Sequence, residues 1–279
     1  DIKDTMIKQT IESAQNQQEG TGVQQDQDMT SIVSDIIVNS NTETGSKMIE
    51  ELNNSSTDTE NDLSLKVISA ISEKDTTKLN TLSENNKEQI EKLTETAIKN
   101  ADASEESAQL IAKVVANASD ELVNKVVEEV SKNSTDENQA LSAKVMKSIV
   151  ETNPEKIETL SDENKQTMIS QTIEAAKNQA EGTSTDEIDL TNTIAEIITK
   201  SDTGTSAKVL KTLEEVSNES DSKLSLNVVS NLTKQENYEE KMEILSVTSS
   251  VVEQSITKLV EKAVENASSE EDLEMVTNI

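Results

Sequence analysis

Cysteine, histidine, arginine, phenylalanine and tryptophan are absent from the 279 residues, and proline and tyrosine occur once each, as Pro154 and Tyr238. The absence of cysteine excludes disulfides, thiolate catalysis and cysteine-based zinc sites, although it does not fix the compartment. Without cysteine or histidine, the usual pairs of nucleophile and base cannot be assembled. We therefore expect a protein that is not an enzyme, with no catalytic, cofactor-binding or metal-binding residues.

Hydrophobic residues are also scarce. They make up 32% of the chain, against roughly 45–50% apolar residues in an average globular domain by a slightly different count. Burial must rest on Ile, Val, Leu, Met and Ala, which each bring less area than an aromatic ring. The apolar runs are a few residues long, far short of the ~20 that span a bilayer. The sequence predicts a thin aliphatic core, no membrane insertion and, at its first residues, no signal region.

Negative charge dominates the chain, which has 55 acidic and 25 basic residues and a net charge of −30. This charge repels phosphate backbones and anionic membranes, and the missing arginine removes the side chain best suited to phosphate and base recognition. We expect no nucleic acid partner and only diffuse screening by divalent cations. High charge with low hydrophobicity is also typical of disorder, but the regular pattern described next argues against it.

The sequence repeats itself. TMIKQTIE at residues 5–12 returns as TMISQTIE at residues 167–174, and TLSENNK at residues 81–87 returns as TLSDENK at residues 159–165. These two spacings predict a repeat about 80 residues long. With a Leu-Ser pair as the end of each copy, the predicted units are 1–83, 84–161, 162–246 and a partial fourth at 247–279.

Within a copy the apolar residues recur at intervals of three or four, which indicates short amphipathic helices. The second copy has three such stripes: Leu110, Ile111, Val114 and Val115; Leu122, Val123, Val126, Val127 and Val130; and Leu141, Val145 and Ile149. Residues 63–67 alternate like a strand, but their copy from Leu224 continues to Leu232 at helical spacing, so we predict helices for both. One longer helix is expected from Pro154 to Ala180. Frequent polar breaks disfavour a single coiled coil.

Residue types at the breaks indicate where helices begin and end. Ser119-Asp120-Glu121 and residues 134–137 (STDE) are typical of helix starts. Gly20 and Gly182 each follow a helical stretch and suit the left-handed position that closes a helix. Asn153-Pro154 places a cap residue before a first-turn proline. If the copies are equivalent in space, Ile11 should be buried like Ile173, and Leu65 like Leu226.

Candidate binding sites are weak. Paired carboxylates such as Glu105-Glu106 and residues 270–272 (EED) are typical of a solvated face unless a pocket raises a pKa. The oxygen-rich loops at residues 24–28 (QQDQD) and 185–189 (TDEID) occupy equivalent places in two copies, but they lack the spacing of an EF-hand. The sequence therefore does not predict a specific calcium site.

The predicted fold is all-α, a tandem helical repeat array that resembles α-solenoids in layout, although the residue patterns of tetratricopeptide, ankyrin and HEAT repeats are missing. Two functions fit such an array. The first is a structural building block of a filament, tube or surface assembly, with copies of itself as the partner; the composition loosely resembles that of bacterial filament subunits. The second is a scaffold segment that binds another protein, which normally requires Tyr, Trp or Arg hot spots. Assembly is favoured over the scaffold, and an extracellular or cell-surface location over the cytoplasm.

Overall fold

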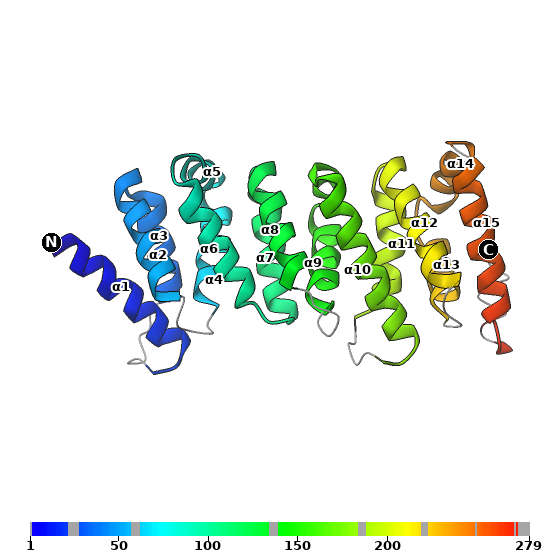
Figure 1. Cartoon of the computed structure of the whole chain (residues 1–279), viewed down its shortest axis with the longest axis horizontal. Coiled ribbons are helices and arrows are strands. Elements are labelled where there is room, and N and C mark those ends of the chain that lie inside the picture. Colours follow the sequence, from blue (N-terminus) through cyan, green and yellow to red (C-terminus); the bar gives the residue numbers. More distant parts are fainter. Residues whose placement is uncertain are drawn as a thin grey trace. The chain divides into compact units, whose positions relative to one another are not determined.

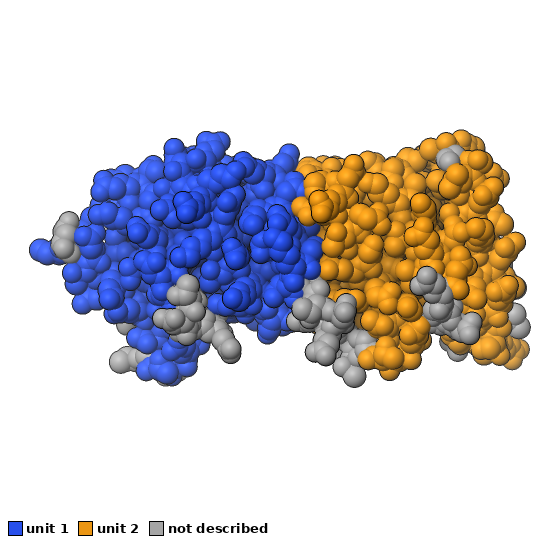
Figure 2. Space-filling model, in the orientation of Figure 1, with its two compact units in different colours: residues 1–133 blue, residues 134–279 orange. Residues whose placement is uncertain are grey.

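A computed structural model describes residues 2–21, 28–56, 62–133, 139–183, 188–218, 223–248, 250–270 and 272. Within these ranges the chain forms fifteen α-helices and one 3₁₀ helix, and no strand. The prediction of an all-α helical repeat array is confirmed, whereas the arrangement as a solenoid stays a prediction. The chain divides into two compact units, which we call unit 1 (Asp1–Asn133) and unit 2 (Ser134–Ile279) (Figure 2). They are distinct from the four predicted copies of the repeat.

Unit 1 is built from helices that pack in two rows (Figure 1). In one row α1, α3, α6 and α8 contact one another in that order, and in the other α2, α4 and α7 do so. Contacts between the rows include those of α1 with α2 and of α4 with α6. The helices of this unit are α1 (Ile2–Gln18), α2 (Met29–Asn39), α3 (Thr42–Ser56), α4 (Leu63–Lys74), α5 (Thr76–Asn85), α6 (Lys87–Lys99), α7 (Glu105–Asn117) and α8 (Asp120–Asn133).

Unit 2 repeats this plan. Helices α10, α12 and α15 contact one another in order, as do α9, α11 and α13, and α9 also packs against α10. The helices of this unit are α9 (Ala140–Thr152), the 3₁₀ helix η1 (Pro154–Thr159), α10 (Asp162–Ala180), α11 (Leu190–Lys200), α12 (Thr203–Asn218), α13 (Leu224–Thr233), α14 (Tyr238–Thr248) and α15 (Ser250–Asn266).

Helices that the sequence repeat makes equivalent pack in the same order. The contacts of α1 with α3, α2 with α4 and α3 with α6 return as those of α10 with α12, α11 with α13 and α12 with α15. Ile11 and Ile173 are 0% and 1% exposed, and Leu65 and Leu226 are 1% and 0% exposed, so the expected equal burial is confirmed. The predicted boundaries at residues 83, 161 and 246 stay a prediction, since compactness divides the chain at a different place.

The core is aliphatic, and small hydroxyl residues occur in it at equivalent places. The stripe on α8 that includes Val126 is buried, and so are the expected stripes on α7 and α9, apart from the half-buried Leu110. Ser64, Ser142 and Ser225 follow a leucine in α4, α9 and α13, and each is fully buried. A small side chain at these places lets neighbouring helices approach closely, which suits a core with few large residues.

Several predicted helix ends are confirmed. Gly20 and Gly182 have φ angles of 67° and 70°. After Gly20, the Thr21 amide donates to the Asn16 carbonyl at 3.0 Å, and after Gly182 the Thr183 amide donates to the Asn178 carbonyl at 2.9 Å. These bonds close α1 and α10 in the same way, with glycine where a side chain would be strained.

Other expected features differ. Residues 63–67 and their copy are helical, as predicted, and α8 begins at Asp120. The single long helix expected from Pro154 to Ala180 is wrong, because the chain turns at Leu160 between η1 and α10. There the Ser161 hydroxyl accepts a hydrogen bond from the Asn164 amide at 3.2 Å and starts a new helix. Pro154 lies in the first turn of η1, but the Asn153 side chain does not cap that turn. Residues 134–137 lie outside the described residues.

Candidate functional site

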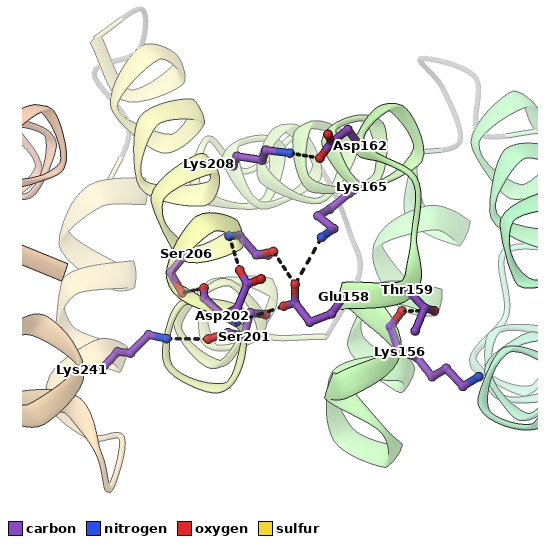
Figure 3. Close-up of polar contacts among 11 residues, drawn as sticks. Lys156, Glu158, Thr159, Asp162, Lys165, Ser201, Asp202, Ser206, Lys208 and Lys241 are labelled. Carbon is purple, nitrogen blue, oxygen red and sulfur yellow. Dashed lines mark hydrogen bonds and ion pairs between the residues drawn. The ribbon is translucent and has the colours of Figure 1, made fainter. Parts of the chain in front are cut away.

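A charged junction in unit 2 links the start of α12 to η1, α10 and α14 (Figure 3). Glu158 of η1 lies at its centre. One carboxylate oxygen, Oε1, accepts from the Asp202 amide at 3.0 Å. The other, Oε2, accepts from the Thr205 hydroxyl at 3.0 Å and from Lys165 Nζ at 3.2 Å. One side chain therefore holds the first turn of α12 and the first turn of α10 together.

Lys165 is the most costly part of this junction, because its residue is only 7% exposed. A buried ammonium group loses much of its hydration, and the loss is tolerable only when an opposite charge faces it. The Glu158 carboxylate supplies that charge, and its own side chain keeps 28% exposure. The pair is therefore partly shielded from water, and removal of Glu158 would leave a buried positive charge.

Asp202 precedes α12 and caps it. Its Oδ1 accepts from the Thr205 amide at 2.6 Å, and its carbonyl accepts from the Ser206 hydroxyl at 2.7 Å. Partial loss of hydration is the largest single influence on the Asp202 carboxyl and by itself would raise its pKa. The hydrogen bond from the Thr205 amide, the contacts with the side chains of Glu158 and Thr205, and the charge of Lys165 together outweigh it, so the pKa lies below its ordinary value. Asp202 is thus a stable anion at the positive end of a helix.

Lys241 of α14 completes the junction by binding the C-terminal end of α11. Its Nζ donates to the carbonyl of Ser201, the C-cap of α11, at 2.5 Å. Burial lowers the pKa of the Lys241 ammonium, and attraction to Asp202 and Glu158 only partly opposes the shift. The same contact occurs in unit 1, where Lys78 of α5 donates to the carbonyl of Ser40, the C-cap of α2, at 2.7 Å.

Unit 1 has a neutral version of the junction. Asn80 of α5 takes the place of Glu158 in the repeat, and its Oδ1 accepts from the Ser119 amide, before α8, at 3.0 Å. Lys87, which corresponds to Lys165, is exposed and pairs with Glu121 of α8. The hydrogen bond is kept while the buried charge is lost. In both units these groups bond to one another, so each junction joins neighbouring helices.

The described residues of the two oxygen-rich loops lie at helix starts. Asp28 and Asp189, from the two oxygen-rich loops, are N-caps that accept from the amides of Thr30 and Asn192, each at 3.0 Å. Residues 24–27 and 185–187 lie outside the described residues. In the part of the chain that the structure describes, no cluster of three or more acidic side chains is placed to hold a metal ion.

The described members of the paired carboxylates are exposed or form an ion pair. Glu105 and Glu106 are exposed in the first turn of α7. Of residues 270–272, Glu270 is exposed, residue 271 lies outside the described residues, and Asp272 pairs with Lys223 at 2.7 Å. That pairing lowers the pKa of Asp272. Among the described helices, none is long and apolar enough to cross a membrane.

An apolar hollow on α1 is one of the features that the sequence did not predict. It measures about 430 Å³ and is lined by Ile2, Lys3, Met6, Ile7, Thr10, Ile36 and Met48. Ile2 is 80% exposed and Met6 is 62% exposed. We call this surface the α1 face. Large apolar side chains exposed together on an acidic protein mark a surface that is suited to contact another protein.

The equivalent surface of α10 is covered. Met168 stands where Met6 stands in the repeat, and it is 0% exposed, while its neighbour Ile169 is 1% exposed. Helix α9 packs against both α10 and α11, and it also packs against η1. The α1 face is therefore an open copy of a surface that is closed by helices within unit 2.

A second exposed apolar surface lies on α14 and α15, which pack against each other. Ile244, Val247 and Val251 are 44%, 78% and 58% exposed. We call this surface the α14–α15 face. The apolar spacing could have revealed it, but exposure depends on which neighbours cover a helix, and one sequence does not show that.

Comparisons with known proteins give no family for this chain. No protein-family model matches it, and no curated protein matches it. One solved structure that it resembles is described as "Computational Design of Self-Assembling Cyclic Protein Homooligomers". The alignment covers 99% of this chain and 91% of that chain at 14% identity, with a TM-score of 0.18. A similarity this low carries no argument about fold or function.

Proposed function

We propose that the chain is a non-enzymatic structural repeat protein, a building block of a filament, tube or surface assembly that grows by helix–helix packing between copies. The observation that carries the proposal is the difference between Met6, which is 62% exposed, and Met168, which is 0% exposed. Both lie in the same TMI sequence block, so the chain has the same surface once open and once covered by helices.

The physical reason is the free energy of apolar burial. Covering one methionine side chain contributes about 1.5–3 kcal/mol, and the α1 face offers Ile2 together with Met6. Against this stands the repulsion between copies that each carry a charge of −30. Salt screens that repulsion over roughly 8–10 Å. We therefore expect assembly to strengthen as ionic strength rises from very low to physiological values.

A protein-binding scaffold is the second candidate. A groove of about 430 Å³ on unit 1, whose lining includes Lys66 and Lys74 of α4, favours it. Binding surfaces of scaffolds usually carry Trp, Tyr or Arg at their centre, and the chain has a single Tyr and neither of the others. The groove therefore supports the scaffold less strongly than the open α1 face supports assembly.

Sedimentation velocity over a concentration series, with negative-stain electron microscopy of the same samples, tests the proposal. The wild-type chain should sediment as growing species and form extended particles. Met6→Asp should shift the distribution strongly toward monomer, because it places a charge on the face that must be buried. Gln109→Asp, an exposed change on α7 that adds the same charge, should leave assembly unchanged. Monomers at all concentrations and salt levels would refute assembly and favour the scaffold.

A further inference from the structure

We propose, on the basis of the proposed assembly, that the partner of the α1 face is the α14–α15 face of a second copy, so that copies join head to tail. The first support is that the apolar residues of the α14–α15 face are not shared by the other copies of the repeat. Ile244 replaces Thr81 of α5 and Thr159 of η1, and Val247 replaces Glu84 and Asp162. Apolar residues appear on α14 where the other copies are polar.

The α1 face shows the same kind of departure. Ile2 stands where the other copies have Asn86, before α6, and Asn164, in α10. Ile2 is 80% exposed, as is expected of a position at which the other copies carry a polar residue. Both faces thus carry exposed apolar residues that the repeat pattern does not require, and burying one against the other removes both from water.

Charge decides between pairing unlike faces and pairing like faces. Glu240 and Glu243 are exposed and precede Ile244 and Val247 by one helical turn, so they border the α14–α15 face. Lys3 lines the α1 hollow beside Met6. Two α14–α15 faces would bring these carboxylates together, whereas an α1 face would bring Lys3 toward them. Like charges in a contact disfavour the wrong partner.

The geometry that results is heterologous, because each copy uses two different surfaces. A heterologous contact leaves one α1 face and one α14–α15 face open at the ends of every oligomer, so it produces a ring when the rotation closes and a filament when it does not. A contact between two identical faces would end at a dimer. The pairing therefore determines whether the assembly can grow.

Disulfide trapping tests the pairing directly, because the chain contains no cysteine of its own. Full-length Met6→Cys is mixed with full-length Val247→Cys under mild oxidation at a concentration where the wild-type chain assembles. The mixture should yield at least about tenfold more cross-linked dimer than free collision gives, since the contact raises the effective concentration of the two thiols. The matched control mixes Met6→Cys with Glu84→Cys, the exposed α5 position that corresponds to Val247.

Each outcome separates this inference from the proposed function. A dimer from Met6→Cys alone, or from Val247→Cys alone, would show pairing of like faces and overturn the head-to-tail contact while assembly stands. So would assembly without any cross-link above the control. Wild-type monomers at every concentration would overturn assembly and head-to-tail pairing together. A second measurement uses charge: Lys3→Glu should weaken assembly, and Glu243→Lys in the same chain should restore it, whereas no restoration would contradict the inferred contact.

Discussion

Asn80 in unit 1 and Glu158 in unit 2 occupy the same place in the repeat. Asn80 accepts a hydrogen bond from the amide of Ser119, just before α8, and Glu158 accepts one from the amide of Asp202, just before α12, each at 3.0 Å. In unit 1 the joint is neutral and the neighbouring Lys87 is exposed. In unit 2 the joint is charged and Lys165 is 7% exposed. The comparison shows that both units keep a side-chain acceptor for this backbone amide, whereas only unit 2 has a charged acceptor with a buried lysine beside it.

The largest effect is expected from charging the aliphatic core of unit 1 alone. Val126 is 2% exposed, so Val126→Asp buries an unpaired carboxylate at a cost of at least about 3 kcal/mol. Hydrogen exchange should show protection lost across residues 84–133 and at their borders, with the region around Ile173 still protected. Asn124→Asp, on the same helix but half-buried, should change little. A uniform loss in both units would show a single cooperative globule instead.

A smaller effect is expected at the two joints. Glu158→Ala leaves Lys165 buried without its partner and should cost about 3 kcal/mol, the lower end for a broken buried ion pair, because Glu158 is partly exposed. Asn80→Ala removes only the acceptor of the Ser119 amide and should cost about 1–2 kcal/mol. Denaturant unfolding, with hydrogen exchange at the starts of α12 and α8, measures both. Equal losses would mean that the buried charge is not the feature that distinguishes the joints.

The smallest effect is a pH-dependent loss of stability in unit 2 that depends on the Asp202 carboxyl. The pKa of Asp202 is lowered in the folded chain, so its contribution to stability is present above pH ~4 and is lost as the pH falls through the lowered pKa. Asp202→Asn should therefore destabilise the start of α12 at pH 6, by less than about 1 kcal/mol because Asp202 is exposed. That difference should shrink as the pH falls below about 4 and should vanish once the pH is below the lowered pKa of Asp202. A difference that persists in acid would assign the effect to shape rather than charge.

Much of the repeat could be predicted from sequence because its signals are local. Helical spacing identified the buried stripe around Val126, and a glycine after a helical stretch identified the ends at Gly20 and Gly182. The break at Leu160 was missed, since an uninterrupted apolar pattern runs through it and only the Ser161 cap reveals a new helix. The joint of Glu158 with Asp202 joins residues 44 positions apart, and a single sequence holds no signal for such a pair.

The exposed faces were missed for a related reason. Met6 and Met168 lie in nearly identical sequence blocks but differ in exposure, and α10 has α9 packed against it in addition to the helices that correspond to the neighbours of α1. Local pattern predicts which side of a helix is apolar, but not whether another helix covers that side. The proposed function therefore depends on the exposure of Met6, which only the structure gives.

Hydrogen exchange of α1 and α10 over a concentration series tests the central claim most directly, because one chain contains both the open face and its covered copy. If copies assemble through the α1 face, protection around Met6 should rise with protein concentration, while protection around Met168 should stay constant and high. Protection around Met6 that is independent of concentration, in samples that span the range where the chain sediments as larger species, would contradict the account.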